Sequence, residues 1–167
     1  GKRAAHHAQT ESYPAGQIDC FENVSKIPEV PDLAIIAIPK SVVLKTMEES
    51  GTKGIKNFVI ITAGFKETGP DGSELEEQLK EIGEKYEMNI LGPNCLGFVN
   101  KRCPVNATFA SVSDEIGNLR FISQSGAIAA SLFDWCNSKR LGFSDFITLG
   151  NKTNITENDV LEYFLNN

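Results

Sequence analysis

The sequence has 167 residues, of which 41% are hydrophobic and 23% are charged, proportions typical of a globular protein. Its net charge of −6 and its pI near 5.0 argue against a basic surface that binds nucleic acid or membranes. No apolar run approaches the ~20 residues of a membrane span, and the N-terminus lacks a signal-peptide pattern, so we expect a cytoplasmic location.

Cysteine and histidine spacing gives no indication of a metal site. The four cysteines include no CxxC pair, which favours free thiols in a reducing compartment. His6 and His7 lie in the opening stretch 1–17, which has no hydrophobic period and is expected to be an irregular arm. No acidic residue or cysteine stands at metal spacing from them, so we predict no metal ligands.

Three short apolar runs, separated by amphipathic patterns, predict a parallel sheet within residues 18–100. The runs are 33–38, 58–63 and 88–91. Unbroken apolar strands are typical of a parallel sheet that is covered by helices on both faces. Ser41 is the expected cap of the first connecting helix, and Ser73 with Glu76 forms a capping-box pattern before the second. The pattern therefore predicts an α/β, doubly wound fold.

The following segment, 101–116, has no clear period and is expected to be a linker to a second unit, 117–167. The expected elements of that unit are strands at 119–122 and 146–149 and helices from Ser125 and from about Thr156, the last capped with Asp159. Two strands are too few to bury a core by themselves, so we expect that the protein continues beyond Asn167 or that other contacts complete this unit. A glycine-rich turn is also missing before Asp32, where a doubly wound fold usually has one.

Small and turn-forming residues follow each of the first three predicted strands. They are Ile38-Pro39, Thr62-Ala63-Gly64 and the segment from Gly92 to Gly97. Ligands of open parallel sheets bind outside the carboxyl ends of the strands, where glycine allows close approach to the backbone. The same residues also suit tight β-to-α turns, so both interpretations stay open.

The segment Ser123-Gln124-Ser125-Gly126 joins a predicted strand to a predicted helix. Free N–H groups and the helix dipole at such a helix start favour an anion such as phosphate, and a simple serine cap is the alternative. A hydrolase nucleophile at Ser125 is disfavoured, because position 123 is not glycine and no histidine follows. Cys95 has no neighbouring histidine or lysine to lower the pKa of its thiol, so we expect it to line a ligand channel.

Five motifs occur in an order and spacing that are similar to those of one known family. They are Thr62-Ala-Gly-Phe65, Leu91-Gly-Pro-Asn-Cys-Leu-Gly97, Asn106-Ala-Thr-Phe109, Ile122-Ser-Gln-Ser-Gly-Ala127, and Asp134-Trp135 with Gly142-Phe-Ser144 and Gly150-Asn151. Together they resemble the ADP-forming acetyl-CoA synthetases (acetate–CoA ligases), which are relatives of the succinyl-CoA synthetase α subunit. The resemblance covers roughly residues 20–167.

The resemblance implies an acid–thiol ligase that converts an acid, CoA and ATP to acyl-CoA, ADP and phosphate through an acyl phosphate and a phosphohistidine. It implies a Rossmann-like CoA-binding domain followed by part of a flavodoxin-like domain. Carried over by position, the CoA-binding residues would be Ile38, Pro39, Thr62, Ala63, Gly64, Asn94, Cys95 and Leu96. Phosphate would be held by Ser123, Ser125 and Gly126.

Other parts of that machinery are expected outside this chain. The phosphohistidine would lie beyond Asn167, so no catalytic residue is expected here, and we expect the chain alone not to turn over acetate. ATP or ADP with Mg²⁺ would belong to an ATP-grasp domain or β subunit. The expected partners are this ATP-grasp domain or β subunit, CoA, a small carboxylic acid and a second copy of the chain.

One alternative is a CoA-sensing regulatory domain of a protein acetyltransferase, which carries a similar module. Gly126 favours the ligase, and the full-length reading frame would distinguish the two. The interval from Tyr13 to Cys20 is also shorter than we expect of the ligase family.

Overall fold

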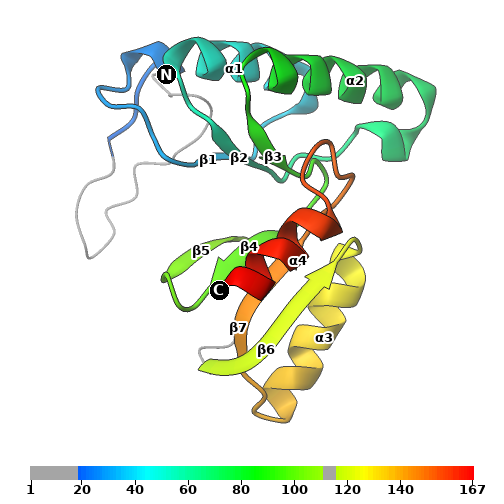
Figure 1. The fold of residues 1–167 in the computed structure, drawn as a ribbon. Coiled ribbons are helices and arrows are strands. Elements are labelled where there is room, and N and C mark those ends of the chain that lie inside the picture. Colours follow the sequence, from blue (N-terminus) through cyan, green and yellow to red (C-terminus); the bar gives the residue numbers. More distant parts are fainter. Residues whose placement is uncertain (1–18, 111–115) are drawn as a thin grey trace.

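The computed structural model describes residues 19–110 and 116–167, which form two units (Figure 1). The first unit consists of η1 (Val24–Lys26), β1 (Ala34–Ile36), α1 (Lys40–Lys53), β2 (Asn57–Ile60), η2 (Lys66–Thr68), α2 (Pro70–Lys85) and β3 (Asn89–Leu91). The second consists of β4 (Gly97–Asn100), β5 (Val105–Thr108), β6 (Ile116–Ser123), α3 (Gly126–Ser138), β7 (Phe143–Thr148) and α4 (Glu157–Asn166). The predicted arm, 1–17, lies outside the described residues. Within them, no helix is long and apolar enough to cross a membrane.

The first sheet is parallel, as the sequence predicts, with the strand order β1-β2-β3. The order advances in one direction, and right-handed crossovers then place both connecting helices on the same face. Figure 1 shows α1 and α2 side by side on that face, and they contact each other. Both connecting helices of the described first unit thus lie on one face, and α4 of the second unit shares a core with Val59 and Leu91 on the other face. The second unit, rather than a helix of the first, packs against the other face.

Successive side chains of β2 point to opposite faces of the sheet, and both faces are buried, which explains why its sequence is an apolar run. Phe58 and Ile60 belong to the core beneath α1 and α2. Val59 and its neighbour Ile61 belong to a different core, which they share with residues of β7 and α4. Because both faces of the strand are buried, no polar residue interrupts it.

The two predicted helix starts in this unit are wrong. α1 begins at Lys40, directly after Pro39, and not at a Ser41 cap. α2 begins at Pro70, whose fixed φ and missing N–H suit the first helical position. Ser73 lies inside α2, where its hydroxyl donates to the carbonyl of Gly69 at 3.2 Å. The proline therefore sets the helix start three residues before the serine.

The second sheet is mixed, with the strand order β5-β4-β7-β6. β6 and β7 are parallel and are joined by α3, which is the predicted β-α-β arrangement. β4 and β5 are antiparallel neighbours that the sequence reading missed, so the segment 101–116 contains a strand, Val105–Thr108. In that strand only Ala107 is buried, and an apolar run is therefore absent. The α/β fold class is confirmed, but the second sheet is not wholly parallel.

Helices cover both faces of this second sheet. Phe121 and Phe146 stack with ring centroids 5.4 Å apart and pack against Phe133 of α3. Ile122 and Ile147, one residue further along each strand, belong to the core that includes α4. The predicted cap of α4 is confirmed, because the Asp159 carboxylate accepts the Thr156 N–H at 2.7 Å.

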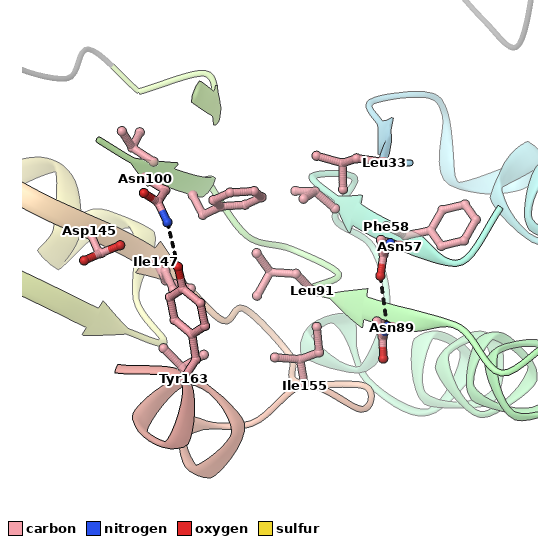
Figure 2. Close-up of a pocket in the computed structure, with 14 residues that line it drawn as sticks. Leu33, Asn57, Phe58, Asn89, Leu91, Asn100, Asp145, Ile147, Ile155 and Tyr163 are labelled. Atoms are coloured by element: carbon pink, nitrogen blue, oxygen red, sulfur yellow. Dashed lines mark hydrogen bonds between the residues drawn. The ribbon is translucent and has the colours of Figure 1, made fainter. Parts of the chain in front are cut away.

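A cavity of about 290 Å³ lies between the two units, on the face of the first sheet away from α1 and α2 (Figure 2). Its lining is mostly apolar and includes Leu33, Leu91 and Ile155. Two side-chain pairs border it: Asn89 donates to Asn57 at 2.9 Å, and Asn100 donates to the Tyr163 hydroxyl at 2.9 Å. None of the predicted CoA or phosphate residues lines this cavity.

Candidate functional site

Thr62, just beyond the end of β2, ties together three of the predicted CoA segments. Its hydroxyl donates to the carbonyl of Ile38 at 2.7 Å and accepts the Ile38 N–H at 3.2 Å. Its carbonyl accepts the N–H of Asn94 at 3.0 Å. The carboxyl ends of β1, β2 and β3 therefore meet at one place, where open parallel sheets bind ligands.

The residues that follow β1, β2 and β3, which we call the turn cluster, differ in how they can contact a ligand. Pro39, Ala63 and Asn94 are exposed and form its open surface. The side chain of Ile38 is buried in the core beneath α1, so its backbone is the part nearest the turn. Gly64 has a φ of +105°, a conformation that glycine adopts without strain.

Lys40 is a residue of this cluster that the sequence reading missed. A Cβ at Gly64 would lie 2.6 Å from Lys40 Cδ, so the lysine side chain crosses directly over the turn. Lys40 is also the first residue of α1, where the helix dipole disfavours a cation. No carboxylate in the described residues forms an ion pair with it. The only sequence signal was its position directly after Pro39.

The Glu67 carboxylate lies against the same turn. It accepts the N–H of Gly64 in a short hydrogen bond and the N–H of Phe65 at 3.1 Å. Burial alone would raise the pKa of Glu67, but the hydrogen bonds from Asn151, Gly64 and Phe65 outweigh it and hold the pKa below its usual value. The turn is thus shaped around an ionised carboxylate.

The Cys95 thiol packs in the core rather than in an open channel. Its sulfur lies 3.4 Å from the carbonyl oxygen of Ile60, in the core shared with Val59 and Leu91. Burial raises the pKa of this thiol to about 11. A neutral buried thiol is a poor nucleophile.

We therefore expect iodoacetamide at pH 8 to modify Cys103, which is exposed, well before Cys95. Cys95 should react at a comparable rate only after denaturation, because both burial and its raised pKa suppress the thiolate. Mass spectrometry of timed samples measures each site. Equal rates for the two cysteines in the native protein would contradict this placement of the Cys95 thiol.

Leu96 connects the predicted CoA turn to the predicted phosphate loop. A Cβ at Gly126 would lie 3.1 Å from Leu96 Cγ, so Leu96 packs on the first residue of α3. The N–H of Leu96 donates to the Thr148 hydroxyl at 2.8 Å, which fixes this turn to the end of β7. The structure therefore brings the two predicted groups of site residues side by side.

The serines of the predicted phosphate loop form a helix cap. The Ser125 hydroxyl accepts the Ile128 N–H at 3.3 Å, and the Ser123 hydroxyl accepts the Ser125 N–H at 3.0 Å. This is the simple cap that the sequence left as an alternative, and it does not exclude a phosphate at the remaining N–H groups.

The cationic side chain connected to this loop is that of Lys152, and Arg120 is engaged elsewhere. Arg120 Nε lies 3.2 Å from Asp145 and its guanidinium covers the ring of Phe164. Lys152 lies 3.0 Å from the Glu157 carboxylate, which also accepts from the Gln124 side chain at 2.7 Å. The hydrogen bond from Gln124, together with Lys152, lowers the pKa of Glu157 to about 2.

Two known protein families match parts of this sequence. The CoA binding domain family matches residues 9–101, more than half of the sequence. The chain belongs to the CoA-binding domain family. Residues 116–167 match a second family, the succinyl-CoA ligase like flavodoxin domain.

Two relatives of this chain are ADP-forming acetate–CoA ligases. It is 46% identical over 144 residues to an ADP-forming acetate–CoA ligase I of Archaeoglobus fulgidus, covering 86% of the chain and 21% of the relative. It is also 46% identical to the α subunit of an ADP-forming acetate–CoA ligase II of Pyrococcus furiosus, covering 87% and 32%. The chain thus spans between a fifth and a third of the length of these relatives.

A solved structure extends the likeness to three dimensions. The dinucleotide-forming acetyl-coenzyme A synthetase 1 of Ca. Korarchaeum cryptofilum superimposes with a TM-score of 0.84 at 37% identity. The match covers 93% of the present chain and 33% of the synthetase. The same synthetase has been solved in complex with phosphate and ADP.

Proposed function

We propose that this chain is the CoA-binding portion of an acyl-CoA synthetase of the nucleoside-diphosphate-forming type. That enzyme makes acyl-CoA, ADP and phosphate from an acid, CoA and ATP through an acyl phosphate and a phosphohistidine. The chain supplies the CoA groove and a phosphate loop. The histidine, the ATP-grasp part and Mg²⁺ come from other parts of the protein or from a partner subunit, and the location is cytoplasmic.

The observation that carries this proposal is the contact of Leu96 with Gly126. Acyl transfer from an acyl phosphate to CoA requires the thiol end of CoA and a phosphate to approach each other. In this fold the turn after β3 and the start of α3 are the two places suited to those groups, and they touch. The ligase relatives support this function over the acetyltransferase alternative.

The turn cluster has the features that an extended anionic ligand needs. Pro39 and Ala63 are exposed residues with short side chains, which leave room for a ligand, and Gly64 allows close approach to the backbone. Lys40 provides a cation above the turn, and an anion there would offset the unfavourable position of this lysine on the helix dipole. We therefore assign Lys40 to a phosphate of CoA.

Isothermal titration of the chain with CoA tests the assignment. Lys40→Ala should weaken CoA binding about fivefold, which corresponds to roughly 1 kcal/mol for a charge pair that stays partly exposed. Lys45→Ala is the matched control, because Lys45 lies on the same helix and is paired with Glu49 at 3.8 Å. It should leave the CoA affinity unchanged.

Two outcomes would count against the proposal. If the wild-type chain binds no CoA, the assignment of the groove fails. If Lys40→Ala and Lys45→Ala behave alike, the groove is not beside Lys40.

A further inference from the structure

Asn151 lies in the loop between β7 and α4 and is almost completely buried, with 7% of its surface exposed. Its side-chain amide donates to Glu67 Oε2 at 2.6 Å and to Glu76 Oε2 at 2.8 Å. Its side-chain oxygen accepts from Asn94 Nδ2 at 3.3 Å, and its N–H donates to the carbonyl of Pro93 at 2.9 Å. One residue of the second unit therefore binds two separate segments of the first.

One of these bonds leads to the CoA turn. The Glu67 carboxylate that accepts from Asn151 also accepts the N–H groups of Gly64 and Phe65. A ligand that occupies this turn competes with Glu67 for those N–H groups or tightens them around it. We expect competition for those N–H groups to move the Glu67 carboxylate and so to change its 2.6 Å hydrogen bond from Asn151.

The next residue leads to the phosphate loop. Lys152 donates to Glu157 at 3.0 Å, and the same carboxylate accepts from Gln124 at 2.7 Å. Gln124 lies between Ser123 and Ser125, so its position is part of the loop conformation. A continuous series of contacts thus runs from Gly64 through Asn151 to the start of α3.

The surroundings of Asn151 make its position sensitive to charge. Glu67 and Glu76 both face its amide, and Lys66 offsets one of them through a 2.8 Å ion pair with Glu76. The two carboxylates repel each other, and the Asn151 amide that donates to both of them offsets part of that repulsion. A displacement of Glu67 therefore changes the balance of forces on the whole β7–α4 loop.

We propose that Asn151 is a positioning residue that couples the two sites, so that CoA at the first changes the affinity of the second for phosphate. This inference rests on the proposed function. Coupling of binding is reciprocal, so phosphate must change the CoA affinity by the same factor. Typical coupling between two sites is about 5-fold to 150-fold, and we expect a value near the lower end, about fivefold.

The test is isothermal titration of the chain with CoA, in the absence of phosphate and at saturating inorganic phosphate. The ratio of the two dissociation constants should differ from unity by about fivefold in the wild type. In Asn151→Ala the ratio should fall close to one. Glu157→Ala should also reduce it, and this residue is partly exposed in the first turn of α4, so the variant keeps the test open if Asn151→Ala does not fold.

Asn154→Ala is the matched control. Asn154 lies in the same loop and also joins the two units, since it accepts the Ile90 N–H at 2.8 Å and donates to the Met88 carbonyl at 2.7 Å. These bonds lie away from both predicted sites. A purely structural role of Asn151 predicts that the ratio survives in both variants, whatever stability each of them loses. Coupling through Asn151 predicts that the ratio survives only in Asn154→Ala.

The outcomes separate the inference from the proposed function. If the wild type binds no CoA, the proposed function is overturned, and the coupling with it. If CoA and phosphate both bind but neither affects the other, the proposed function stands and the coupling is wrong. Coupling that persists in both Asn151→Ala and Glu157→Ala also overturns the inference.

Discussion

Replacing Arg120 by methionine should lower the free energy of unfolding by about 3 kcal/mol, because it leaves a buried carboxylate without its charge partner. Arg120 Nε lies 3.2 Å from Asp145, whose side chain is only 3% exposed. Breaking a buried ion pair on one side typically costs about 3–5 kcal/mol. We expect the lower end of that range, since the Arg120 side chain keeps 22% of its surface exposed and Ser144 still donates to Asp145 at 2.9 Å.

Urea unfolding measures this loss, with Lys80→Met as the control for an ordinary surface ion pair. Lys80 lies 3.7 Å from Glu77 with both side chains largely exposed, so its removal should cost less than about 1 kcal/mol. The double variant Arg120→Met, Asp145→Leu should recover most of the lost stability, because neither charge then remains buried. Phosphate affinity in the single variant should be unchanged. A loss of phosphate affinity without a loss of stability would place Arg120 in the phosphate site instead.

The parts of the fold that could be predicted are the strands whose residues form apolar runs, and β2 is the clearest case. β2 is an unbroken apolar run because one face meets α1 and α2 and the other meets the second unit. β5 has only Ala107 buried, so its sequence has no apolar run and resembles a linker. The Ser73–Glu76 pattern misplaces the start of α2, because Pro70 occupies the first helical position. Local patterns thus locate the strands that are unbroken apolar runs and miss β4 and β5, which are not.

The candidate site likewise contains residues that could be predicted and residues that could not. Thr62 and Gly126 follow strands directly, so their position at the carboxyl edge of a sheet could be inferred from the chain order. Lys40 and Asn151 act through contacts between distant segments, and the local patterns that contain them do not reveal those contacts. The bond from Asn151 to Glu76 joins residues 75 positions apart. Such a pair becomes visible only when the two units are packed together.

A substitution at Gly97 distinguishes the two interpretations that the sequence left open for the turn after β3, namely close approach of a ligand and a tight turn of the chain. Replacing it by alanine should lower the free energy of unfolding by about 4 kcal/mol. Its φ is +98°, and a Cβ there would lie 1.9 Å from the carbonyl oxygen of Ala107. Strain of this kind costs about 1–3 kcal/mol, and overpacking against rigid backbone costs about 1–3 kcal/mol more.

Gly69→Ala separates the two causes. Gly69 has a similar φ of +108°, but a Cβ there would meet nothing within 4 Å, so this variant should lose only the part due to strain. Thermal and urea unfolding of both variants give the difference, which measures how closely β4 must approach β5. If glycine at position 97 instead serves the approach of a ligand, Gly97→Ala will be no less stable than Gly69→Ala and will bind CoA more weakly. A larger loss of stability in Gly97→Ala assigns this glycine to strand packing, and leaves Pro39, Ala63 and Gly64 as the open part of the groove.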